Sequence, residues 1–181
     1  MKRNLLSLLL VLGLSACGEE PVAPPPTPAD PLANCTRGSI EPDLTFLAPL
    51  GGPALRADGT LTPGRYIVSS TYLAMKPEPQ AQQHFGELMG PIRQTLQQQQ
   101  GLLAIQLGTS ESCATARTLT VWKDEESMYS FVTSDAHLAA MSAVGEVSRG
   151  SSVVTHWADD ENGVSWTKAA QQLGADEGPL Y

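Results

Sequence analysis

The fold is decided by the stretch Leu119–Val144, which reads LTVWKDEESMYSFVTSDAHLAAMSAV. Its first residues, Leu119–Trp122, alternate bulky and β-branched side chains, and this pattern predicts a strand. Glu125 and Glu126 fall in the first turn of a predicted helix, where the positive end of the helix dipole favours negative charge. A strand that leads directly into an amphipathic helix predicts an α+β architecture, in which the helix lies on its own sheet.

Apolar residues at helical spacing mark the side of this helix that faces the sheet. The stripe consists of Met128, Phe131, Val132, Leu138, Met141 and Val144. Ser134 and Asp135 lie between the two halves of the stripe and can cap a second helical segment. We therefore expect two helical segments that point in slightly different directions.

The remaining elements complete the order β-α-β-β-α-β. Strands are predicted at 65–75, 102–108, 117–122 and 151–158. Helices are predicted at 79–100 and 125–144, with a short final helix at 166–173. This order is typical of the ferredoxin-like split βαβ fold, an α+β arrangement with a four-stranded antiparallel sheet and two helices on one face.

The same stretch resembles the dimeric α+β barrel superfamily, the ferredoxin-like proteins that include antibiotic-biosynthesis monooxygenases and haem-degrading monooxygenases. The matching features are TVW at 120–122, the acidic turn after it, the aromatic pair Tyr129 and Phe131, and SDAHLAAM at 134–141. The resemblance covers about 65–157. It implies the fold and leaves the activity open, because the superfamily includes many members without known chemistry.

The predicted fold leaves one face of the sheet without helices. The resemblance implies that a second identical subunit covers this face, so that a homodimer forms sheet against sheet. The alternative is coverage from within the chain, by residues 36–64 and the C-terminal helix. Either arrangement buries the apolar side chains of that face.

The sequence divides into a front end, an extension and one α+β domain within its 181 residues. Residues 35–64 are rich in Gly and Pro and predict an irregular extension with one short strand near 44–47. The α+β domain is expected at 65–174, and 175–181 is expected to be a loose tail.

Residues 1–16 are predicted to be a lipoprotein signal peptide. Lys2 and Arg3 form its basic region, and the apolar region Leu5–Leu14 is too short to span a membrane. The sequence LSAC, which ends at Cys17, resembles the bacterial lipobox, and this implies diacylation of the cysteine and removal of the residues before it. The alternative is an ordinary secretory peptide with an incidental cysteine.

The expected location is the bacterial cell envelope, with the membrane bound through the acyl chains on Cys17. Gly18, rather than Asp, follows the cysteine, and in a Gram-negative envelope the sorting rule then favours the outer membrane, facing the periplasm; the sequence leaves the envelope type open. Residues 17–34 contain the run PPPTP and predict an extended tether of about 3.1 Å per residue. The formal charge of −8 becomes about −10 after cleavage, which argues against nucleic acid as a partner.

Two cysteines remain after lipidation, Cys35 and Cys113. An even pair in an oxidising compartment predicts a disulfide, which ties the end of the tether to the loop before the third strand. Closing a loop of this length stabilises the fold by about 4 kcal/mol in the chain-entropy model. The alternatives are two free thiols or a metal pair, but the sequence has no nearby His or further Cys to complete a metal site.

The residues that carry haem degradation in the resembled enzymes are replaced here. Those enzymes use an Asn on the first strand, a Trp on the second helix and a haem-ligating His, and the matching positions are Ser70, Phe131 and Met141. Met141 lies at helical spacing from Leu138 and Val144, as a core residue does. We therefore reject haem degradation and predict no cofactor.

His137 is the sharper candidate for chemistry. It lies one turn before Met141, and a neutral imidazole between helix and sheet can act as a base or bind a ligand. The alternative is a helix histidine that bonds to a carbonyl or a neighbouring carboxylate. The predicted ligand pocket between the sheet and the helices is lined by Ser70, Trp122, Phe131, His137 and Met141.

Three functions remain open, because the sequence contains no GxSxG, HExxH, CxxC, Walker or dinucleotide motif. The leading hypothesis is a lipid-anchored envelope protein whose monooxygenase-like domain binds a small apolar ligand or partner without catalysis. The alternative is a cofactor-independent monooxygenase that acts on a quinol-like or polyketide-like aromatic, with His137 as its base. A third hypothesis makes the domain a dimerisation unit on the membrane.

Overall fold

The computed structural model describes residues 31–181. The predicted signal peptide, Cys17 and most of the predicted tether lie outside the described residues. The strands are β1 (Thr45–Phe46), β2 (Arg65–Ala74), β3 (Leu102–Ser110), β4 (Thr115–Trp122) and β5 (Val153–Asp160). The helices are α1 (Pro79–Gln98), α2 (Glu125–Val132), α3 (Asp135–Ser142), α4 (Val144–Val147) and α5 (Trp166–Ala175).

The strands form one antiparallel sheet in the order β1-β3-β4-β2-β5. The last four strands of this order are the four that the sequence predicts, and their arrangement is that of the ferredoxin-like fold, so the predicted fold class is confirmed. β3 and β4 form the expected hairpin. The short strand expected near 44–47 is β1, which adds a fifth strand at the edge of the sheet by pairing Thr45 with Thr109.

The second helix of the prediction is divided, as the sequence suggests. The Asp124 side chain caps α2 by accepting from the Ser127 backbone N–H at 2.8 Å. The Ser134 side chain caps α3 by accepting from the His137 N–H at 3.4 Å. The change of direction turns Leu138 outward, and 50% of it is exposed, so its predicted place in the buried stripe is wrong.

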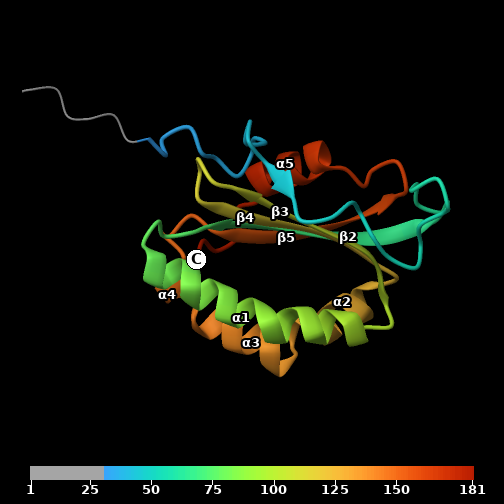
Figure 1. The fold of residues 1–181 in the computed structure, drawn as a ribbon. Helices are drawn as coiled ribbons and strands as arrows, with labels where there is room; N and C mark the ends of the chain where they lie inside the picture. Colours follow the sequence, from blue (N-terminus) through green and yellow to red (C-terminus); the bar gives the residue numbers. More distant parts are fainter. Residues whose placement is uncertain (1–30) are drawn as a thin grey trace, which may run out of the picture.

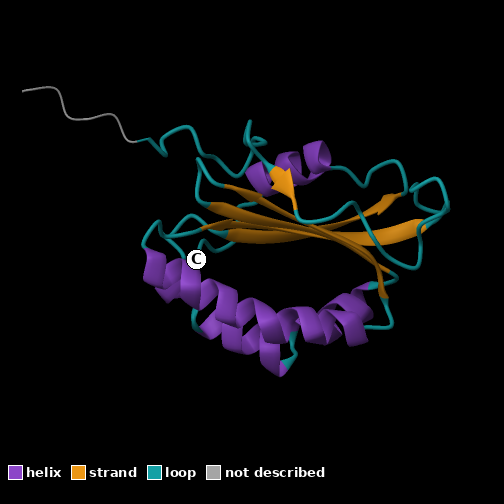
Figure 2. Cartoon of the chain, in the orientation of Figure 1, coloured by secondary structure: helices purple, strands orange, loops and turns teal. Residues whose placement is uncertain are grey.

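The helices lie on both faces of the sheet, as Figure 1 shows. Helices α1 to α4 occupy one face, and α5 and the N-terminal extension occupy the other (Figure 2). The core on the α5 face contains Ala54 and Leu61 of the extension, Val68 and Val121 of the sheet and Ala169 of α5. The chain therefore covers this face itself, and the face is not open to a second subunit.

A disulfide and a buried ion pair hold the extension on the sheet. The predicted bond between Cys35 and Cys113 is present. Arg117 of β4, 1% exposed, donates from Nε to a carboxylate oxygen of Glu41 at 2.8 Å and from Nη2 to the Ser39 carbonyl at 2.6 Å. The guanidinium also lies 4.5 Å from the centre of the Tyr72 ring. A buried arginine thus finds its partners in a segment 76 residues earlier in the chain.

The predicted loose tail ends in an ordered contact. The Tyr181 backbone N–H donates to the Ser152 carbonyl at 2.9 Å, and the Ser152 N–H donates back to the Tyr181 carbonyl at 3.0 Å. Ser148 donates a further hydrogen bond from Oγ to the same carbonyl. This end of the chain lies on the side of the sheet that carries α1 (Figure 1). Within 31–181, no helix combines the length and the apolar character that crossing a membrane needs.

Candidate functional site

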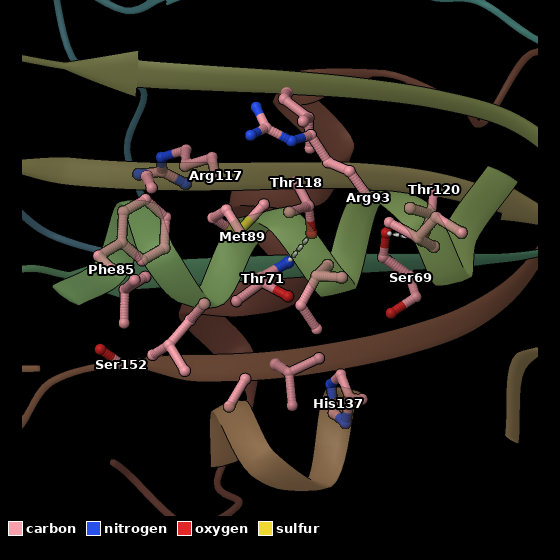
Figure 3. Close-up of a pocket in the computed structure, with 18 of the residues that line it drawn as sticks. Ser69, Thr71, Phe85, Met89, Arg93, Arg117, Thr118, Thr120, His137 and Ser152 are labelled. Carbon is pink, nitrogen blue, oxygen red and sulfur yellow. Dashed lines mark hydrogen bonds between the residues drawn. The ribbon is translucent and has the colours of Figure 1, made fainter. Parts of the chain in front are cut away.

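A cavity of about 400 Å³ lies between the sheet and helices α1 to α4. Its walls come from β2, β3, β4 and β5 on one side and from these helices on the other, as the close-up in Figure 3 shows in part. Phe85 and Met89 of α1 project into it from the helical layer. A hollow of this size is within the range of about 300–1,000 Å³ that small-molecule sites occupy.

The alternation of β2 decides which of its side chains meet the cavity. The even-numbered residues Tyr66, Val68, Ser70, Tyr72 and Ala74 are buried against the α5 face. The odd-numbered residues Ser69, Thr71 and Leu73 line the cavity and are only half-buried. The strand is therefore tightly packed on one face and open on the other.

Four of the five predicted pocket residues line the cavity. They are Trp122, Phe131, His137 and Met141. Ser70 does not line it, because it faces the α5 side, is fully buried and donates from Oγ to the Thr118 carbonyl at 2.7 Å. Side chains on a strand alternate between faces, so a register error of one residue places the wrong side chain in a site. Ser69 and Thr71 take the place predicted for Ser70.

Aromatic rings form one end of the cavity. The Trp122 and Phe131 rings are stacked, with centres 5.7 Å apart, and the His137 ring meets Phe131 edge to face at 5.0 Å. The indole N–H of Trp122 donates to Thr120 Oγ1 at 2.9 Å and is therefore not free for a ligand. This end presents apolar ring surface to the cavity.

His137 is held in one tautomer. Its Nδ1 lies 3.0 Å from the Val132 carbonyl oxygen, which can only accept, so Nδ1 carries the proton and Nε2 has the free lone pair. Burial lowers the pKa of His137 below its ordinary value of 6.5, although the hydrogen bond to Val132 opposes this shift. The imidazole is therefore neutral at pH 7, as a base or a hydrogen-bond acceptor requires.

Three hydroxyl groups of the cavity wall form hydrogen bonds within the protein. Ser69 Oγ donates to the Thr155 carbonyl at 3.1 Å, and Thr120 Oγ1 donates to the Ser69 carbonyl at 3.2 Å. Thr118 Oγ1 accepts from the Thr71 backbone N–H at 3.2 Å, the bond drawn in Figure 3. Ser69 and Thr120 therefore use their hydroxyl hydrogens within the protein, whereas Thr118 uses only a lone pair and keeps its hydroxyl hydrogen for a ligand.

Sequence reasoning missed Arg93, which reaches the cavity from α1. It follows Ile92, which is buried against the sheet side of α1, and it is itself exposed, so helical spacing alone gives no signal for a place in the cavity wall. The Arg93 side chain is exposed and forms no ion pair or hydrogen bond within residues 31–181. No group of three His, Cys, Asp or Glu residues within that range is placed to hold a metal ion.

Residues 71–143 match the family model for antibiotic biosynthesis monooxygenase. The match runs from the last part of β2 to the end of α3 and includes most residues of the cavity walls, and it supports the superfamily that the sequence resembles. No curated protein matches the chain.

Several solved structures are similar to this chain. Protein FN1347 of Fusobacterium nucleatum shares 15% identity over 66% of this chain and 50% of its own, with a TM-score of 0.48, so the match spans half of that protein. Protein SO0527 of Shewanella oneidensis shares 16% identity over 55% of this chain and 97% of its own, with a TM-score of 0.47. Protein Rv0793 of Mycobacterium tuberculosis shares 16% identity over 52% and 93%, with a TM-score of 0.44.

Proposed function

We propose that the protein is a lipid-anchored envelope protein whose α+β domain binds a small apolar ligand between the sheet and α1 to α3, without chemical change to the ligand. The observation that carries this proposal is the cavity of about 400 Å³, which is lined mainly by apolar side chains. The hydroxyls of Ser69 and Thr120 support it further, because their hydrogens already bond to backbone carbonyls and cannot be donated to a polar ligand.

Native mass spectrometry of the full chain tests ligand binding directly. We expect a co-purified small molecule whose mass disappears in Ala140→Trp, because Ala140 of α3 lines the cavity and a Trp there fills it. Ala139→Trp is the matched control, because Ala139 is the exposed neighbour of Ala140 and does not line the cavity. A chain that remains empty, and that takes up no apolar probe, would contradict the proposal.

The anchor is proposed from Cys17 and from the lipobox-like sequence before it. Growth with an alkyne-bearing palmitate should label the wild-type protein, and Cys17→Ser should abolish the label and release the protein from the membrane fraction. If the wild-type protein carries no label, the proposed lipid anchor is wrong, and residues 1–16 are an ordinary secretory peptide with an incidental cysteine at 17.

The second candidate function is a cofactor-independent monooxygenase with His137 as its base. The neutral imidazole supports it, because Nε2 has a free lone pair at the wall of the cavity. In such a reaction Nε2 accepts the phenolic proton, a ring carbon gains a carbonyl oxygen from O₂, and the second oxygen atom leaves as water with two hydrogens of the substrate.

An oxygen electrode separates the two functions. An oxygenase should consume O₂ with an added hydroquinone and should lose this activity in His137→Ala. His156→Ala is the matched control, because His156 is exposed on β5 and lies outside the cavity wall. Ligand binding without O₂ consumption supports the first function.

A homodimer remains a prediction, and the sheet face first expected to form it is occupied by α5 and residues 36–64. A dimer would have to use another surface, such as the exposed apolar side chains Tyr129 and Leu138 on α2 and α3. Light scattering of wild-type protein and of Leu138→Lys tests this, and a monomer in both would also end the dimerisation-unit hypothesis.

A further inference from the structure

A second hollow, of about 470 Å³, adjoins the cavity at the C-terminal end of α1. Five residues line both hollows: Leu47, Arg93, Leu96, Ile105 and Leu107. The second hollow has a more polar wall, which includes the side chains of Gln97, Gln99 and Gln100. An apolar space therefore lies directly beside a polar one.

Arg93 is the charged residue at this junction. Both hollows include it in their walls, its side chain is exposed, and within the described part of the chain it has no carboxylate partner. In the view of Figure 3, Arg93 of α1 lies in the upper part of the cavity and His137 of α3 in the lower part. A guanidinium without a partner at the rim of an apolar cavity is suited to an anionic group.

The cavity also reaches the surface at two places, which suits a long ligand. Leu47, which follows β1, is 68% exposed beside the second hollow, and Val154 of β5 is 42% exposed at the opposite edge of the sheet. Both line the cavity, so its apolar wall reaches the surface at both edges of the sheet. A compact aromatic ligand would leave part of this length unfilled, whereas a molecule with a long alkyl chain can lie along all of it.

We propose that the ligand is a fatty carboxylate, with its acyl chain in the cavity and its carboxylate on Arg93 at the junction with the second hollow. This inference rests on the proposed ligand-binding function and specifies its ligand class. The neutral His137 is compatible with a methylene chain beside it, and the glutamine amides of the second hollow supply polar surroundings for the head group.

Photo-crosslinking tests the ligand class on the full chain in phosphatidylcholine vesicles. The probes are hexadecanoic acid with a diazirine in mid-chain and the matching alcohol, and mass spectrometry of peptides locates the cross-links. We expect the acid to label peptides of β2 and α1 that contain Thr71 and Met89. Arg93→Gln should lower this labelling about tenfold and leave labelling by the alcohol unchanged, because a charge-assisted hydrogen bond is lost. Arg56→Gln, in an exposed loop, should change neither.

The outcomes distinguish this inference from the proposed function. If acid and alcohol label the cavity equally and Arg93→Gln has no effect, the carboxylate is wrong and apolar binding stands. If neither the acid nor the alcohol labels the cavity, while Ala140→Trp still displaces a co-purified molecule, the proposed long-chain ligand is wrong and ligand binding stands. If a diazirine lysophosphatidic acid labels the cavity more strongly than the fatty acid, the proposed carboxylate head group is wrong and the ligand carries a phosphate. If no probe labels the cavity and no small molecule co-purifies with the protein, both proposals are wrong.

Discussion

The two faces of the sheet are filled differently, although the same strands supply both. On the α5 face, Val68, Ala104 and Val121 are fully buried against the chain's own extension and helix. On the other face, the neighbouring residues Ser69 and Thr71 remain half-buried and look into a cavity. Close packing stabilises a fold, and a space within it leaves room for a ligand. We therefore expect the α5 face to determine stability and the cavity face to determine function.

The largest effect should come from the buried ion pair on the α5 face. Glu41→Leu leaves Arg117 buried without its carboxylate, and we expect a loss of about 3–5 kcal/mol in the free energy of unfolding. Denaturant unfolding followed by Trp fluorescence measures it. The double variant with Arg117→Met should lose less than the two single variants together, because no unpaired charge remains. If Glu41→Leu lowers the free energy of unfolding by less than about 0.5 kcal/mol, the α5 face is not the main source of stability.

Removal of the disulfide should have the next largest effect. Replacing Cys35 and Cys113 by Ser opens a loop of 78 residues and should cost about 2–4 kcal/mol. Wild-type protein unfolded with a reducing agent should show the same loss, whereas the double variant should not respond to that agent. Equal stability with and without reductant would show that the noncovalent contacts of the extension suffice.

A matched pair of alanines compares the faces directly. Ala169 of α5 is fully buried in the core, whereas Ala140 of α3 lines the cavity. Leu at Ala169 overfills a packed site and should cost about 1–3 kcal/mol. Leu at Ala140 should leave stability nearly unchanged and should weaken ligand uptake. Denaturant unfolding and native mass spectrometry of both variants check this, and equal destabilisation would contradict the difference between the faces.

The smallest effect should be a pH dependence from His137 on the cavity face. Burial lowers its pKa in the folded state below 6.5, so the unfolded chain binds more protons between the two pKa values. The free energy of unfolding should therefore fall as the pH drops below about 6.5 and should level off once the lowered pKa is passed. Unfolding midpoints between pH 5 and 8 measure this, and His137→Gln should flatten the profile. An identical slope in that variant would assign the effect to another group.

Local patterns predicted the strands and helices well, because alternation and helical spacing depend on neighbouring residues. Ser134 marked the division of the second helix, since its cap needs only the next turn. The ion pair between Arg117 and Glu41 had no local signal, because it depends on folding the extension back over the sheet. The outward position of Leu138 followed from a change of direction that spacing alone does not specify.

Only part of the site was predicted, because local patterns place residues of one stretch and not residues of different elements. Trp122, Phe131, His137 and Met141 belong to one continuous stretch, and its periodicity placed them on the correct side. Ser70 was assigned through a looser match on another strand, where a shift of one residue reverses the face. Arg93 belongs to a third element, and its place in the cavity wall depends on how α1 packs on the sheet, which the sequence of α1 does not specify.

The disulfide also decides how the domain carries mechanical load. A pull on the chain before Cys35, against any point after Cys113, passes through the sulfur–sulfur bond and not through the residues between them. The loop that is bypassed contains β2, α1 and β3, and thus a large part of the cavity wall. Tension on the N-terminal side therefore enters the fold at the hairpin turn before β4 and bypasses the part of the cavity wall that β2, α1 and β3 supply.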